Sequence, residues 1–100
     1  MSRAATELAL SRFEDADRLL SRVLVDEVWL RDRPWFHAFV LDMSGRVAEQ
    51  LDDPARARLA YSDALAILAA TKMPDGQWSP AQRKALQQRH DALVAAAAKQ

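Results

Sequence analysis

The chain has 100 residues, of which half are apolar, with 14 basic and 14 acidic side chains, no cysteine, two glycines and 20 alanines. This length suits one small domain, and the lack of cysteine excludes disulfides, thiolate zinc sites and a thiol nucleophile. Zero net charge argues against direct nucleic-acid binding or a polybasic membrane anchor. Abundant Ala with little Gly predicts an all-α fold over residues 1–100.

The first third of the chain, residues 2–33, contains no Gly or Pro. Within it, the run from Ser11 to Glu14 reads S-x-x-E, a pattern in which the Ser caps a helix and the Glu reaches back to its N-terminus. We therefore predict a break near Ser11, with a short helix over residues 2–10 and a longer one over 12–30. A single uninterrupted helix is the alternative.

The middle of the chain predicts two further helices, each beginning at a proline. Pro34 suits a first helical turn, because its missing N–H is not needed there, and an apolar stripe of helical period follows it: Phe36, Val40, Met43, Val47 and Leu51. Asp53 is a good N-cap before Pro54, which starts a helix that we expect to end near Thr71.

The last third predicts a turn and then a final helix. Met73–Gly76 combines a Pro that presets φ with a Gly that permits positive φ, so it is typical of a turn. Ser79, Pro80 and Gln82 supply an N-cap, a first-turn proline and a reciprocal cap, which starts a helix over residues 80–98. The narrow apolar face of this helix is typical of a helix at the end of a stack of helices, which packs against a neighbour on one side only.

Two stretches of the chain are similar at an offset of 41 residues, residues 11–24 and 52–65. Each has a polar turn, then Ala (Ala16, Ala57), then a large residue four positions later (Leu20, Tyr61). Periodicity of this size is typical of helical repeats. Leu41, Gly45, Ala57, Tyr61 and Ala64 stand where the tetratricopeptide repeat has its bulky and small positions, and on these residues the chain resembles that family.

The resemblance has departures: Ser44 and Ala48 replace the Leu and Tyr of the motif, and the period exceeds the usual length of about 34 residues. It implies about five helices forming antiparallel αα-hairpins in a right-handed stack. Repeat one would cover residues 2–31, repeat two residues 34–72, and a capping helix residues 80–98. The family binds proteins or peptides, and in its stacks the first helix of each pair lines a concave groove.

The side chains that are able to act as catalysts or metal ligands do not form a catalytic or metal-binding pattern in the sequence. His37 and His90 lack a second ligand at metal spacing, and the paired carboxylates fall at helix starts and turns, where they favour the helix dipole. No phosphate loop or nucleophile elbow is present. We therefore expect no enzymatic activity, no cofactor and no metal.

A partner-binding surface is the functional site that the sequence favours. Trp35 and Phe39 lie four residues apart at an aromatic junction with Trp29, and such side chains are enriched at interfaces. The alternative for these two residues is a place at the edge of the core. If the resemblance holds, the groove would contain Phe39, Asp42, Arg46 and Glu49, joined by Arg83 and His90 from the last helix; the alternative is a solvated face. Asp42 and Arg46 replace the Lys and Asn with which related repeats clamp acidic tails, so we do not expect a carboxylate clamp of that kind.

We therefore predict a module that binds a protein or peptide partner, as an adaptor or assembly factor. The alternative is a regulatory or oligomerisation domain of a bacterial transcriptional activator or kinase. Because two repeats make a short stack, we also expect a homodimer or an obligate partner. No apolar run approaches the roughly 20 residues that span a bilayer, and the N-terminus lacks a signal-peptide pattern, which predicts a cytoplasmic protein without direct membrane or nucleic-acid contact.

Overall fold

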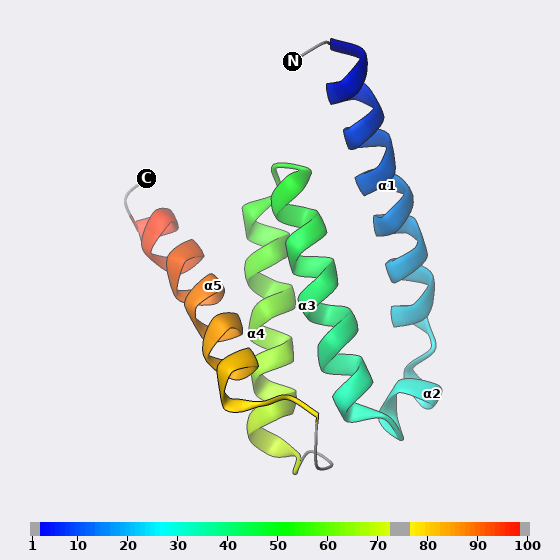
Figure 1. The fold of residues 1–100 in the computed structure, drawn as a ribbon. Coiled ribbons are helices and arrows are strands. Elements are labelled where there is room, and N and C mark those ends of the chain that lie inside the picture. The colour runs from blue at the N-terminus through cyan, green and yellow to red at the C-terminus, as the bar shows by residue number, and fades with distance from the viewer. Residues whose placement is uncertain (1–2, 73–76, 99–100) are drawn as a thin grey trace.

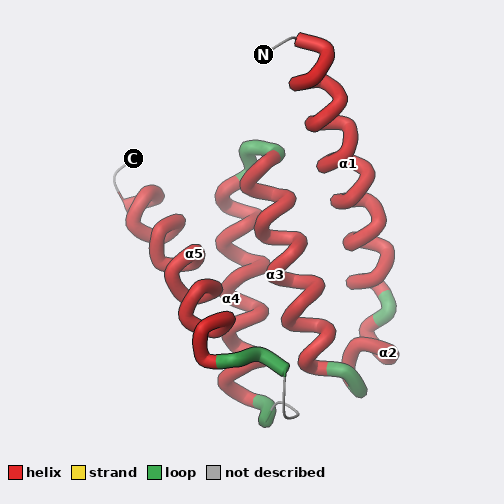
Figure 2. Tube along the Cα trace, in the orientation of Figure 1, coloured by secondary structure: helices red, strands yellow, loops and turns green. Residues whose placement is uncertain are grey.

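The structure is a computed structural model that describes residues 3–72 and 77–98, with side chains from Arg12 onward. All regular elements in these ranges are helices. They are α1 (Arg3–Val25), α2 (Glu27–Arg31), α3 (Pro34–Gln50), α4 (Pro54–Ala70) and α5 (Pro80–Ala98). Figure 1 shows α3 between α1 and α4, with α5 on the far side of α4, and Figure 2 shows the short loops that join them. The prediction of an all-helical chain is confirmed.

The predicted break near Ser11 is wrong, because α1 continues through that residue to Val25. A capping pattern only offers partners for a helix start, and nothing in this Gly- and Pro-free segment prevents the preceding turns from continuing. The chain instead leaves the helix at Asp26, whose carboxylate accepts a hydrogen bond of 3.2 Å from the backbone N–H of Trp29. Residues 3–31 therefore hold one long helix and one short one, not the predicted pair divided at Ser11.

The other predicted helix starts are confirmed. Pro34 lies in the first turn of α3, and the Asp53 side chain accepts a 3.2 Å hydrogen bond from the backbone N–H of Arg56 at the start of α4. At the start of α5, Ser79 N donates to Gln82 Oε1 at 2.7 Å and Gln82 N donates to Ser79 Oγ at 3.2 Å. The predicted turn at residues 73–76 lies outside the described residues.

The core lies on two faces of α3. One face packs against α4 and α5 around fully buried Tyr61, Ala57, Ala64 and Leu86. The other places Val40 and Val47 against Leu20 of α1. The predicted apolar stripe of α3 is therefore partly correct: Val40 and Val47 are buried, while Met43 is 39% exposed.

Gly45 allows α3 and α4 to approach closely. A Cβ at this position would lie 2.7 Å from Cδ1 and 2.8 Å from Cζ of Tyr61, well inside van der Waals contact. The Tyr61 ring is therefore packed closely against α3 at Gly45, where a larger residue in place of Gly45 would displace it. None of the helices in the described ranges is long and apolar enough to cross a membrane.

Candidate functional site

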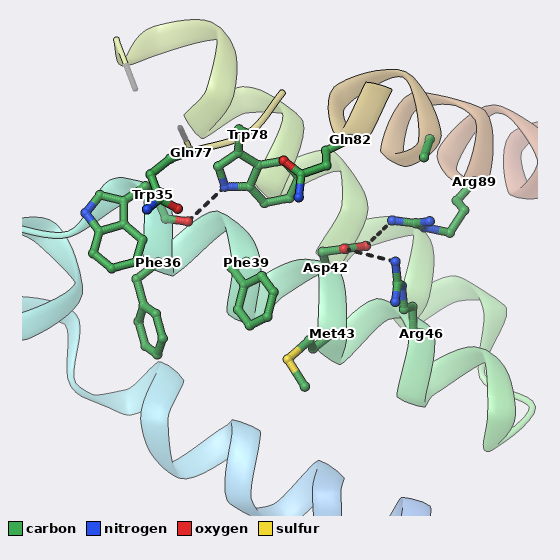
Figure 3. Close-up of a pocket in the computed structure, with 11 residues that line it drawn as sticks. Trp35, Phe36, Phe39, Asp42, Met43, Arg46, Gln77, Trp78, Gln82 and Arg89 are labelled. Atoms are coloured by element: carbon green, nitrogen blue, oxygen red, sulfur yellow. Dashed lines mark hydrogen bonds and ion pairs between the residues drawn. The ribbon is translucent and has the colours of Figure 1, made fainter. Parts of the chain in front are cut away.

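A pocket of about 540 Å³ opens between α3 and α5 (Figure 3). Helix α3 contributes residues at helical spacing along one stripe, and α5 contributes Gln82, Ala85 and Arg89 at steps of three and four. The remaining wall comes from residues 77 and 78, which precede α5. Among the described residues, those that line the pocket are Trp35, Phe36, Phe39, Asp42, Met43, Arg46, Gln77, Trp78, Gln82, Ala85 and Arg89.

Aromatic side chains form one end of the pocket. The indole Nε1–H of Trp78 donates a hydrogen bond of 2.9 Å to the carbonyl oxygen of Trp35, which ties the segment before α5 to the start of α3. Trp78 adopts a positive φ of 52°, an uncommon backbone conformation for a bulky residue. The positive φ makes Trp78 a locally strained residue, and the hydrogen bond from its indole holds it in place in the pocket wall.

The aromatic end continues along α3 towards α2. Phe36 lies edge-on to Trp29 and Trp35, with ring centroids 5.1 Å and 5.7 Å apart, and stacks on Phe39 at 6.4 Å. These are the favoured geometries of aromatic pairs. Trp35 and Phe36 are partly buried, whereas Phe39 is 48% exposed. Phe39 is therefore the aromatic side chain of α3 that offers most contact area to a ligand.

A buried carboxylate and two arginines form the other end. Asp42 is only 6% exposed. Its Oδ1 accepts a hydrogen bond of 2.7 Å from Nη2 of Arg89, and its Oδ2 lies 3.6 Å from Nη2 of Arg46 (Figure 3). The contact with Arg89 joins α3 to α5 across 47 residues of sequence. Because a buried carboxylate without a partner is costly, this arrangement fixes the two helices in register.

The two arginines differ in what they can offer to a ligand. The Arg89 side chain is 26% exposed and its guanidinium carbon lies 5.8 Å from the centroid of the Tyr61 ring. Its Nε is buried and has no hydrogen-bond partner among the described residues. The Arg46 side chain is 57% exposed, and its distance to Asp42 exceeds that of a hydrogen bond. Arg46 is thus the cation of the pocket with donors directed to solvent.

Tyr61 lies behind the pocket, with its hydroxyl donating to Oε2 of Glu49 at 2.5 Å. Burial, and then the hydrogen bond and negative charge of Glu49, raise the pKa of Tyr61 above its usual value. Glu49 was predicted as a groove residue, but its carboxylate accepts this hydrogen bond and does not line the pocket. This pair supports the packing of α3 on α4.

Six of the seven predicted site residues lie in two separate hollows, and Glu49 lines neither. Trp35, Phe39, Asp42 and Arg46 line the α3–α5 pocket together. Arg83 and His90 instead line a second hollow between α4 and α5, also of about 540 Å³. In that hollow they lie with Gln87 beside an apolar stripe of α4, and Nε of Arg83 donates to the carbonyl oxygen of Trp78 at 3.2 Å.

Trp78, Gln82 and Arg89 are among the lining residues that the sequence did not predict as part of the site. Leu86 is the fully buried centre of α5, and on a helix of 3.6 residues per turn Gln82 and Arg89 flank it on one side while Arg83 and His90 flank it on the other. The sequence predicts the buried stripe but not which flank faces α3. The prediction therefore selected the neighbouring side of the correct helix.

No group of three His, Asp or Glu side chains within residues 3–72 and 77–98 is placed to hold a metal ion. Nδ1 of His90 lies 3.6 Å from Oδ1 of Asp91 and is buried without a hydrogen-bond partner among the described residues. The chain matches no protein-family model, and no curated protein or solved structure is significantly similar to it. The geometry of the pocket is therefore the feature of this chain that indicates a function.

Proposed function

We propose that the chain is a protein interaction module that binds a polypeptide segment of a partner in the α3–α5 pocket. The observation that carries the proposal is the juxtaposition of partly exposed Phe39 with the Trp35–Trp78 wall at one end and exposed Arg46 at the other. An apolar floor with a few convergent polar groups is typical of binding sites. Aromatic residues and Arg also dominate the energetics of protein interfaces.

The same geometry supports a tetratricopeptide-like arrangement of the helices, which is part of this proposal. In such a stack α3 and α4 would form one antiparallel hairpin and α5 the capping helix, so that α3 and α5 would line the concave side. Gly45 against Tyr61 fits the close helix crossing that the motif implies. The pocket lies between the two helices that this arrangement predicts.

The pocket is better suited to binding than to catalysis. Its carboxylate, Asp42, faces an arginine at each oxygen, so both oxygens already have partners within the fold. We infer that the module acts by holding a partner and has no catalytic role of its own.

The test uses peptides selected for binding from a random library displayed on phage, with affinities measured by calorimetry. Phe39→Ala removes a side chain that is 48% exposed, so the fold is retained while the contact is lost. We expect it to weaken binding by about 1–2 kcal/mol, as for a typical interface anchor. Leu59→Ala, at a residue of α4 that is 64% exposed and outside the pocket lining, is the matched control and leaves affinity unchanged. Peptides that bind both variants equally would refute the proposal.

A further inference from the structure

We infer that the partner segment is an acidic peptide, in which a carboxylate follows or precedes an apolar anchor and binds the guanidinium of Arg46. This inference rests on the proposed function, since it names the ligand chemistry of the same pocket. It starts from the charge of the lining residues, which include two arginines and one carboxylate. Because Arg89 pairs closely with Asp42, the excess positive charge lies on Arg46, whose side chain is the most exposed of the three.

Arg89 is committed within the fold and so is not the recognition group. It makes the shorter contact, 2.7 Å, to nearly buried Asp42 and lies 5.8 Å from the Tyr61 ring. Withdrawing it would leave a buried carboxylate with only the more distant Arg46. Its role is to fix α5 against α3, so its guanidinium is already bound to Asp42 when a ligand enters the pocket.

Arg46 has the donors that a ligand carboxylate needs. Its side chain is 57% exposed, and its contact with Asp42 at 3.6 Å is an ion pair without a hydrogen bond. A guanidinium presents several N–H donors in a fixed plane that match a carboxylate bidentately. Arg46 can therefore keep its electrostatic contact with Asp42 and bind a second carboxylate from the partner.

The spacing of the two recognition points predicts the peptide. Phe39 and Arg46 lie seven residues apart on α3, which corresponds to about 10 Å along the helix at about 1.5 Å per residue. An extended peptide advances about 3.3 Å per residue. We therefore expect the Asp or Glu to lie about three residues from the aromatic or aliphatic anchor.

The surroundings limit both the position and the source of the carboxylate. Glu49 lies one helical turn beyond Arg46 and carries the opposite charge, which disfavours an acid placed further along α3. A second copy of the chain that docked pocket to pocket would bring together two linings that each carry the same excess positive charge, at a cost in like-charge repulsion. A separate acidic segment has the complementary charge.

The experiment is a selection from displayed peptides with one fixed aromatic position and random flanking residues. We expect enrichment of Asp or Glu about three residues from the aromatic one. The best selected peptide should bind Arg46→Gln about tenfold more weakly than wild type, because a charge-assisted hydrogen bond is lost. Its affinity should also fall at an ionic strength of about 1 M, where the Debye length is about 3 Å. Arg18→Gln is the matched control, since Arg18 is 70% exposed and pairs with Asp15 at 3.4 Å on α1, away from the pocket; it leaves affinity unchanged.

The outcomes separate this inference from the proposed function. Peptides that lose affinity with Phe39→Ala but show no acidic enrichment and bind Arg46→Gln normally would overturn the acidic ligand and leave the interaction pocket in place. Peptides that are insensitive to Phe39→Ala would overturn both. Sedimentation without peptide completes the test: a dimer that dissociates on Phe39→Ala would assign the pocket to a second copy and overturn the inference.

Discussion

Gly45→Ala tests the close packing of α3 on α4 with a change of a single methyl group. The new Cβ would lie 2.7 Å and 2.8 Å from ring atoms of Tyr61, which is fully buried and held by its hydrogen bond to Glu49. Overpacking of this kind costs up to about 3 kcal/mol, while Ala gains about 1 kcal/mol over Gly in helix propensity. We expect a net loss of about 2 kcal/mol in the free energy of unfolding.

The assay is urea unfolding followed by far-ultraviolet circular dichroism, with the midpoint and the slope fitted separately. The midpoint should fall with the slope unchanged, and thermal unfolding should shift down by about 10 °C for a chain of this size. Ala92→Gly, at an exposed position of α5, calibrates the propensity contribution alone and should cost about 1 kcal/mol.

A Gly45→Ala variant that is more stable than wild type by about 1 kcal/mol would refute the reasoning, because propensity would then act without a steric cost. A second check uses Tyr61→Leu as the background, where the smaller side chain leaves room at Gly45. There the Gly45→Ala substitution should cost less than in wild type, and an equal cost in both backgrounds would contradict the assigned contact.

Three further predictions concern the contacts that position the pocket. Asp42→Asn should lower the free energy of unfolding by about 2 kcal/mol, which is less than the loss of a fully buried ion pair would cost, because the two arginines are 26% and 57% exposed. Asp15→Asn, in the exposed pair with Arg18, should change the free energy of unfolding by less than about 0.5 kcal/mol. Equal urea midpoints for the two variants would contradict this prediction. Because burial and Glu49 raise the pKa of Tyr61, the unfolded phenol ionises near pH 10 while the folded one stays protonated, so wild type should lose stability relative to Tyr61→Phe as the pH rises above about 10. Urea titrations of both proteins at about pH 9 and about pH 11 measure this, and a constant difference would disprove it. Ser79→Ala should cost about 1 kcal/mol in the same unfolding assay by removing the cap of α5, and an unchanged midpoint would show that the capping box does not stabilise the helix.

Local signals in the sequence predicted the helix starts well. Pro34, Asp53 with Pro54, and Ser79 with Gln82 act on backbone groups within three or four residues, so their effect depends little on the rest of the chain. The pattern at Ser11 has the same local form but lies within a segment that continues as a helix on both sides. The capping patterns that correctly predicted a helix start in this chain, at Asp53 and Ser79, are the ones followed directly by a proline.

The site was less predictable, because it depends on how helices far apart in sequence face one another. Asp42 was expected in an open groove, but Arg89, 47 residues away, covers and pairs with it. On α5, the flanks of Leu86 are both polar, and only the packing against α3 selects the side with Gln82 and Arg89. The positive φ of Trp78, which sets the aromatic wall, leaves no pattern in the sequence.

The most direct test of the interaction pocket is to map the binding of a selected peptide by nuclear magnetic resonance on the isotope-labelled chain. The largest shifts should occur at the indole N–H of Trp78 and at the backbone amides of Phe39 and Met43, which line the pocket between α3 and α5. Shifts concentrated at Arg83, Gln87 and His90, in the hollow between α4 and α5, with the Trp78 indole unchanged, would contradict it.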